Sequence, residues 1–328
     1  MALSGQPCSL VLPVSTAVHV DAARRALVRL AGSVTQDETL LGRLTIVAQE
    51  LGYNLVRHAG HGELCATLGD AGVLDVLAVD RGPGMQDVAR CLTDSYSTAA
   101  TLGAGLGAIR RQSDVFDIHS RPGQGTVVLA RFHLAGAPNS RLHLGALCTP
   151  HPEEQVCGDT WAVSGRRLLV CDGLGHGQQA AAASRRAREL FLRQAAHLPL
   201  QQLMENLHQA LMETRGAALA LAELDADQGQ VSFCGIGNIA GRLFGNGARS
   251  LVSNNGTLGY RIGRIQTFTY PWTPGTLLVM NSDGLTSKVS LGEHSGLGGR
   301  HPALIAALLH RDFRRPADDA TVLVLKHV

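Results

Sequence analysis

Four aspartates in the second half of the chain stand in short glycine-containing segments beside predicted strands. They are Asp159 after a Cys-Gly pair, Asp172 at the start of DGLGHG, Asp283 within NSDG and Asp318 at the start of DDAT. Carboxylates at strand ends on one edge of a sheet can meet around metal ions, and a ligand set made only of oxygen suits Mg²⁺ or Mn²⁺ better than zinc. Two such ions activate water and neutralise a phosphate monoester. The pattern therefore predicts a phosphate-hydrolysing metal site.

His176 lies within the same DGLGHG segment. A histidine at this position can serve as a metal ligand or as a general base. We assign it to the loop instead, because the carboxylates alone can fill the ligand set.

A second group of polar residues, in the first half, is suited to nucleotide binding. Glu50 and Asn54 lie four residues apart on the clearest predicted helix, so they project from one face. The carboxylate can accept a proton, and the amide oxygen can bind Mg²⁺. Asp80 ends a predicted strand before Gly82 and Gly84, where a carboxylate can accept a hydrogen bond from an exocyclic amine. The alternatives are a solvated helix face for the first pair and an ordinary turn at Asp80.

Alternating glycines precede the next predicted helix. Gly103, Gly105 and Gly107 stand in the segment TLGAGLG, directly before residues 108–112. Glycines at a helix N-terminus let backbone N–H groups approach phosphate oxygens, where the helix dipole favours negative charge. The segment is not a Walker A motif, because no Gly-Lys-Ser/Thr occurs, and no βαβ unit with a ribose-binding acid follows it.

Strands and helices alternate along the chain and must position these residues. Leucines and a valine at three- and four-residue steps predict a helix over 35–58. The other elements predicted in the first half are helices at 20–31 and 108–112 and strands at 9–14, 63–68, 73–79, 115–119 and 126–132. Those predicted in the second half are helices at 178–194, 200–214 and 302–309 and strands at 160–163, 167–171, 217–224, 231–235, 241–244, 276–280 and 321–326.

A turn-forming segment near residue 140 divides the chain. We predict a first domain over residues 1–135, a linker over 136–144 and a second domain over 145–328. A length of 328 residues is sufficient for two domains. The division separates the two groups of candidate site residues.

The composition excludes several classes of protein. The 29 basic and 27 acidic residues nearly balance and aromatic residues make up 4%, so we expect no nucleic-acid partner. We expect no membrane partner either, because no apolar run approaches the roughly 18 residues of a membrane helix. The N-terminus lacks the basic start of a secretory signal. Seven scattered cysteines, never spaced as CxxC, indicate reduced thiols and a cytoplasmic location.

Four separate segments of the first half resemble the N, G1, G2 and G3 boxes of the GHKL ATP-binding fold. In chain order they are Glu50-x-x-x-Asn54, Asp80-x-Gly82-x-Gly84, Gly103-x-Gly105-x-Gly107 and Gly123-x-Gly125-Thr126. Residues 5–135 look most like the anti-sigma-factor serine kinases, especially the switch kinase of the stressosome. The resemblance implies that Asn54 holds Mg²⁺ on the phosphates of ATP and that Glu50 is the general base or the group that orients water. It further implies an adenine-binding Asp80 and an ATP site completed by Gly82, Gly84, Gly103, Gly105, Gly107 and Thr126.

The second half resembles the PPM (PP2C-like) serine/threonine phosphatases, in the SpoIIE-type sporulation and stress-response branch. The resemblance spans residues 142–328 and includes GD, DGLGHG, GIGN, NNGTLG, NSDG and DDAT. It implies two Mn²⁺ or Mg²⁺ ions, with Asp172 and Asp283 at the catalytic centre. The implied metal ligands are Asp159, Asp172, Asp283 and Asp318, with Gly173 contributing its carbonyl.

Together the resemblances imply an α/β (α+β) chain, in which a GHKL-type α/β sandwich precedes a PPM-type α-β-β-α sandwich. We expect a phosphatase with an ATP-binding, serine-kinase-like domain that acts in a partner-switching stress response. The expected partner is a STAS-domain antagonist of an anti-sigma factor or a stressosome-type phosphoprotein, with a sigma factor as a further candidate. The alternative is an N-terminal domain that senses ATP, or binds a sigma factor or antagonist, and gates the phosphatase without transferring phosphate.

Overall fold

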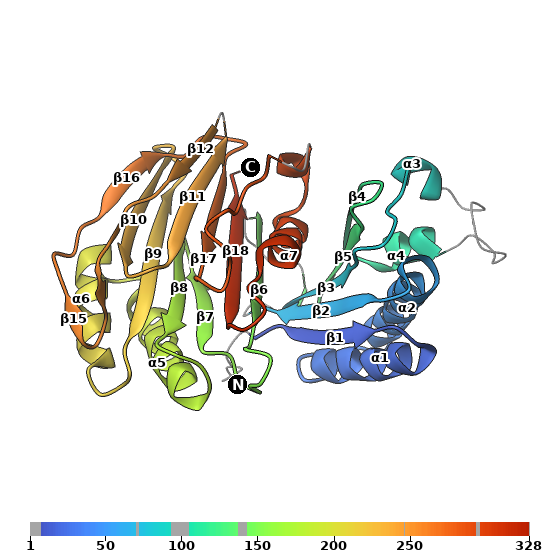
Figure 1. The fold of residues 1–328 in the computed structure, drawn as a ribbon, viewed down its shortest axis with the longest axis horizontal. Coiled ribbons are helices and arrows are strands. Elements are labelled where there is room, and N and C mark those ends of the chain that lie inside the picture. Colours follow the sequence, from blue (N-terminus) through green and yellow to red (C-terminus); the bar gives the residue numbers. More distant parts are fainter. Residues whose placement is uncertain are drawn as a thin grey trace. The chain divides into compact units, whose positions relative to one another are not determined.

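The computed structural model describes residues 8–69, 72–92, 105–136, 143–245, 247–292 and 296–327. The chain divides into two compact units, Ser9–Ser140 and Arg141–Val328, and Cys8 belongs with the second (Figure 1). Each unit has its own sheets and its own hydrophobic core. They are therefore described separately.

The N-terminal unit is built on one antiparallel sheet of five strands in the order β1-β2-β3-β5-β4. The strands are β1 (Leu10–Val14), β2 (Gly62–Leu68), β3 (Val73–Val79), β4 (Val115–Ser120) and β5 (Thr126–His133). Strand β3 lies at the centre, and six of its seven residues are buried. The sheet places the end of β3, where Asp80 follows, beside the start of β5.

Helices cover this sheet. They are α1 (Ala17–Gly32), α2 (Glu38–Asn54), the short α3 (Val88–Cys91) and α4 (Gly105–Gln112). Helix α2 packs between α1 and α4 and buries Leu44 and Leu51 against sheet residues such as Leu64. The Asp37 side chain caps it by accepting hydrogen bonds from the next turn. The predicted helix over 35–58 is thus correct in type, but it is α-helical only to Asn54 and continues as a π-helical turn, Leu55–Ala59.

Two sheets face each other in the C-terminal unit. One has the order β13-β10-β9-β8-β7 with β16 paired to β10, and the other has the order β12-β11-β17-β18-β6. The first sheet consists of β7 (Asp159–Ser164), β8 (Arg167–Gly173), β9 (Ala217–Asp225), β10 (Gln230–Ile236), β13 (Ser253–Asn254) and β16 (Phe268–Pro271). The second consists of β6 (His143–Thr149), β11 (Ala240–Gly245), β12 (Gly247–Ser250), β17 (Leu277–Asn281) and β18 (Ala320–Lys326). A small ribbon, β14 (Gly256–Thr257) with β15 (Arg261–Ile262), is separate.

Alternate residues of the strands build alternate cores. On β8, Leu168 and Val170 enter the core between the two sheets, whereas Leu169 and Cys171 pack under the helices. Helices α5 (Gln178–Gln194) and α6 (Leu200–Leu211) cover the first sheet, and α7 (Pro302–Phe313) covers β6 and β18 of the second. The layers are helix, sheet, sheet and helix, as Figure 1 shows. The α-β-β-α sandwich expected from the sequence is confirmed.

Several elements were absent from the prediction, namely α3, β6, β12 to β16 and a 3₁₀ turn at Leu297–Gly299. Residues 137–142 of the predicted linker lie outside the described residues. Among the helices of the described part, none has the length and apolar character needed to cross a membrane.

Candidate functional site

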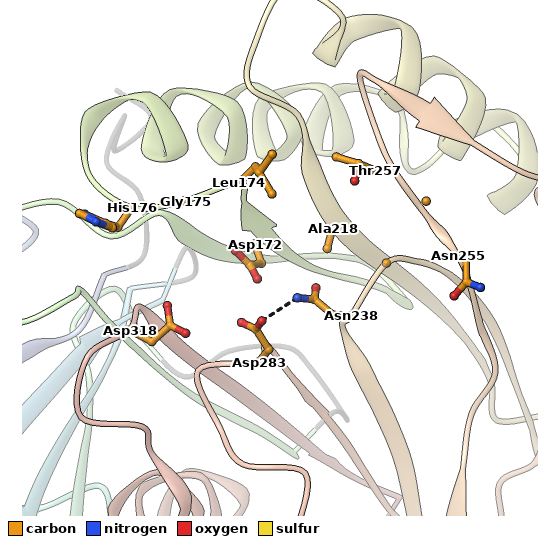
Figure 2. A pocket seen from close by; sticks show the side chains of 12 residues that line it. Asp172, Leu174, Gly175, His176, Ala218, Asn238, Asn255, Thr257, Asp283 and Asp318 are labelled. Carbon is orange, nitrogen blue, oxygen red and sulfur yellow. Dashed lines mark hydrogen bonds between the residues drawn. The ribbon is translucent and has the colours of Figure 1, made fainter.

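Three of the four predicted aspartates face one pocket in the C-terminal unit. Asp172 on β8, Asp283 after β17 and Asp318 before β18 line a cavity of about 620 Å³, and their carboxyl groups point toward one another (Figure 2). They come from the two different sheets of the sandwich. The prediction that these carboxylates converge is therefore met for this trio.

Strand pairing explains why the three residues meet. Strands β17 and β18 are antiparallel neighbours, so the residue just after one and the residue just before the other emerge at the same edge. Ser282, between β17 and Asp283, connects this edge to the other sheet, because its Oγ donates to Asp159 Oδ2 over 2.6 Å. Asp159 in turn pairs with Asp172 across β7 and β8.

Asp159 lies behind the pocket rather than in its wall, and only 1% of its surface is exposed. Burial, followed by repulsion from Asp319, raises the pKa of Asp159 to about 7. Asp319 is also buried; its Oδ1 accepts a hydrogen bond from the His151 N–H at 2.9 Å, and among the described residues its Oδ2 has no partner. Gly158 makes room for this carboxylate, since a Cβ there would lie 2.7 Å from Asp319 Oδ2.

Negative charge is concentrated at the pocket. Burial is the main cause that raises the pKa of Asp172 to about 10, and repulsion from Asp159 and Asp283 adds to it. A side-chain interaction with Asp283 acts in the same direction on the pKa of Asp172. Burial and Asp283 also raise the pKa of Asp318, and Arg315 acts in the opposite direction.

This donor set fits a hard divalent cation in its chemistry and its charge. Its members are all carboxylate oxygens, and their mutual repulsion would be relieved by a dication. Within the described ranges, no three His, Cys, Asp or Glu side chains have the spacing of an assembled metal centre. Gly173, the predicted carbonyl ligand, ends β8 next to Asp172, and its N–H donates to the Gly158 carbonyl at 3.1 Å.

His176 is placed at the rim of the pocket. Its Nδ1 lies 2.8 Å from Glu154 Oε1, and its ring stacks on His151 at 4.6 Å between centroids. The side chain is 55% exposed. Its interactions are with the segment before β7, which agrees with the loop role assigned from the sequence.

Asn238, for which the sequence predicted no role, lines the same pocket. Its Nδ2 donates to Asp283 Oδ2 over 2.7 Å, so it fixes the orientation of that carboxylate (Figure 2). Asn238 ends the family-like GIGN segment, and that segment is the sequence signal that could have indicated a role for it. Gly237 has a φ of 92°, and a Cβ added there would lie 2.6 Å from the Ala218 Cβ.

The N-terminal unit brings together the first predicted pair and a glycine of the third box. A Cβ added to Gly105 would lie 3.1 Å from Glu50 Oε2 and 3.5 Å from Asn54 Oδ1. The first turn of α4 therefore approaches the polar face of α2 closely. Gly107 is buried in α4, and Gly103 lies outside the described residues.

Asp80 organises the turns at the end of β3. Its Oδ1 accepts hydrogen bonds from the N–H groups of Gly82 at 2.8 Å and Thr126 at 3.1 Å. Gly84, with a φ of 69°, leaves no space for a side chain, because a Cβ there would lie 2.0 Å from the Arg121 carbonyl oxygen. The first and last glycine boxes thus close on each other around this carboxylate.

Comparison with known families divides the chain at the same region. Residues 164–328 match the family described as Stage II sporulation protein E (SpoIIE), and residues 13–132 match the Histidine kinase-like ATPase domain. The first match contains Asp172, Asp283 and Asp318, and the second contains Glu50, Asn54 and Asp80.

Two proteins of Bacillus subtilis (strain 168) are similar to the chain. The Serine/threonine-protein kinase RsbT is 31% identical over 132 residues, which are 39% of this chain and 96% of RsbT. The Phosphoserine phosphatase RsbX is 25% identical over 138 residues, which are 40% of this chain and 69% of RsbX.

Two solved structures share the fold over more than half of the chain. One, from work on the bacterial stressosome, has a TM-score of 0.52 and 25% identity and covers 57% of this chain and 100% of its own. The other, RsbX in complex with magnesium, has a TM-score of 0.51 and 21% identity and covers 58% of this chain and 97% of its own.

Proposed function

The chain belongs to the SpoIIE family through its C-terminal half and to the family of RsbT through its N-terminal half, and on this premise we propose a metal-dependent protein serine/threonine phosphatase with an ATP-binding, serine-kinase-like domain. The single observation that carries the phosphatase proposal is the convergence of Asp172, Asp283 and Asp318 on one pocket. Separate strands of two sheets supply these residues, so the arrangement is a property of the fold rather than of one turn.

In this proposal, Asp172, Asp283 and Asp318 hold Mn²⁺ or Mg²⁺, and Asp159 supports them from behind. When bound, such ions lower the pKa of a water molecule and neutralise a phosphoryl group. Asn238 holds the Asp283 carboxylate through its 2.7 Å hydrogen bond. Ser282 holds the Asp159 carboxylate in the same way, through the 2.6 Å hydrogen bond that its Oγ donates.

Hydrolysis of p-nitrophenyl phosphate with Mn²⁺ tests the proposal. We expect Asp283→Asn to lower kcat by at least about tenfold, because the loss of even an outer-shell partner of a metal ligand lowers activity by about 10- to 100-fold. Asp227→Asn is the matched control, since Asp227 is 90% exposed in the β9–β10 turn. Equal rates for wild type and Asp283→Asn would refute the site.

The N-terminal unit is proposed to bind Mg-ATP and to phosphorylate serine on a partner protein. Asn54 would ligate Mg²⁺, Glu50 would act as general base and Asp80 would bind the adenine amine. Supporting this proposal are the 31% identity to RsbT, whose name states kinase activity, and the packing of Gly105 against Glu50 and Asn54. Gly82, Gly84, Gly103, Gly107 and Thr126 would complete the nucleotide site.

The proposed partner is a STAS-domain phosphoprotein of a cytoplasmic partner-switching pathway. The names of the two similar proteins carry opposed activities, a serine/threonine kinase and a phosphoserine phosphatase, and one chain that joins them can set the phosphorylation of such a partner. Incubation of the Asp283→Asn protein with γ-labelled ATP and a STAS partner tests transfer while label removal is blocked. Label on the partner supports a kinase, whereas its absence together with ATP-dependent hydrolysis by wild type supports a nucleotide sensor.

A further inference from the structure

The pocket that contains the aspartates extends well beyond them. Its volume of about 620 Å³ is in the range of pockets that hold drug-sized ligands, and a phosphoryl group fills only part of it. Asp318 and His176 lie on one side, and Asn255 and Thr257 lie on the opposite side (Figure 2). The cavity therefore has an acidic end and a second end that the proposed hydrolysis does not use.

Neutral groups form this second end. Its side chains are the amide of Asn255, the hydroxyl of Thr257 and the aliphatic groups of Leu174 and Ala218. Leu174 is 55% exposed and presents an apolar surface beside the two polar groups. A neutral wall beside an acidic one does not suit a second phosphate; it suits an uncharged segment attached to the phosphoryl group.

The backbone of this wall is fixed before any ligand arrives. The Asn254 carbonyl accepts a hydrogen bond from Gly237 N–H at 2.9 Å. Leu258 and Ala217 exchange two backbone hydrogen bonds, of 2.9 and 3.0 Å. These contacts anchor both sides of Asn255 and Thr257 to β9 and β10, so the wall is pre-organised and binding costs little ordering of the chain.

The polar groups of the wall remain available. Within the described part of the chain, neither the Asn255 amide nor the Thr257 hydroxyl makes a side-chain hydrogen bond. A carboxamide carries both donors and an acceptor, which match the C=O and N–H of a peptide group. Such a pair recognises main chain irrespective of its side chains, while Leu174 offers an apolar surface beside it.

We propose that Asn255, Thr257 and Leu174 form a subsite for the polypeptide segment next to the phosphorylated serine. The subsite rests on the proposed phosphatase function and deepens it, because it makes phosphoserine within a polypeptide the preferred substrate over a small phosphate ester. The main chain of the segment binds Asn255 and Thr257, and a neighbouring side chain covers Leu174.

Two substrates that undergo the same hydrolysis distinguish a loss of binding at this subsite from a loss of catalysis at the acidic end. The probes are the peptide acetyl-Ala-Ala-phosphoserine-Ala-Ala-amide and p-nitrophenyl phosphate, both with Mn²⁺. The readout is the specificity ratio, kcat/KM for the peptide divided by kcat/KM for the ester. We expect Asn255→Ala to lower this ratio about fivefold, the value of one neutral hydrogen bond, through a higher KM for the peptide. Thr257→Val, which keeps the shape and removes the hydroxyl, should lower it in the same direction.

Gln228→Ala is the matched control, because it removes an exposed amide in the β9–β10 turn away from the pocket. Its ratio should equal that of wild type. An unchanged ratio in both Asn255→Ala and Thr257→Val, with wild type active on the ester, overturns the subsite and leaves the proposed function intact. If the wild type hydrolyses neither probe, the proposed function is refuted, and the subsite is refuted with it.

Discussion

Single side chains in the C-terminal unit have roles that depend on contacts between sheets. Asp159, Asp172, Asp283 and Asp318 were predicted from sequence as one ligand group, yet the structure puts three in the pocket wall and Asp159 behind it. The difference arises because Ser282, from the other sheet, binds Asp159. A motif shows which residue types are present. Whether an aspartate lies in the pocket wall or behind it depends on packing between segments more than 120 residues apart. The role of each aspartate as a metal ligand stays a prediction.

His310 shows the same dependence on burial and gives a pH-dependent prediction. It is buried on α7 beside Thr149 Oγ1 at 2.9 Å, and burial lowers its pKa from 6.5 to about 3. Below pH 6.5 the unfolded chain gains a proton at this site that the folded chain does not, so stability falls as pH falls toward 3. Between pH 7.5 and 5 this histidine should cost the wild type about 2 kcal/mol of unfolding free energy.

Urea unfolding followed by tryptophan fluorescence measures this loss of unfolding free energy in the C-terminal unit, because both tryptophans, Trp161 and Trp272, lie in the core of that unit. His310→Gln keeps a hydrogen-bonding side chain and removes the titration. Between pH 7.5 and 5, the unfolding free energy of His310→Gln should fall by about 2 kcal/mol less than that of wild type. Parallel pH curves for the two proteins would contradict the assignment.

At the scale of elements, long periodic segments were predicted well and short strands were not. Helix α5 has the predicted bounds, 178–194, because a full amphipathic face repeats over its length. Strands β13, β14 and β15 contain two residues each, too few for any period to appear, and they were missed. They nevertheless flank and include Asn255 and Thr257. The NNGTLG segment carries part of the family resemblance, but its strands are too short for periodicity to predict where these two side chains lie.

Helix α2 supplies the prediction at this scale. Glu50 and Asn54 occupy its last turns, and α4 begins at Gly105 directly against them. We expect Asn54→Ala to weaken Mg-ATP binding by at least about tenfold in calorimetric titration, since it removes the proposed metal ligand. Thr39→Ala, at an exposed position of the first turn of the same helix, is the control. Wild-type affinity in Asn54→Ala would show that the nucleotide, if bound, does not use this face.

On the scale of the whole molecule, the chain joins two units whose relatives are named for opposite reactions. The α-β-β-α architecture of the second unit was predictable because its motifs fall at strand ends in a recognisable order. The positions of the motif residues in space were not, because they depend on which strands become neighbours, such as β17 beside β18. Under the proposed function, one polypeptide would control both the addition and the removal of phosphate.

The most direct test of the central claim is a calorimetric titration of the full chain with Mn²⁺, paired with the Mn²⁺ dependence of p-nitrophenyl phosphate hydrolysis. We expect binding and activity to rise over the same Mn²⁺ concentrations. Asp172→Asn and Asp318→Asn should each weaken binding by at least about tenfold, while Asp227→Asn should not. Unchanged Mn²⁺ affinity in both pocket variants, or hydrolysis that persists in excess EDTA, would refute the metal site.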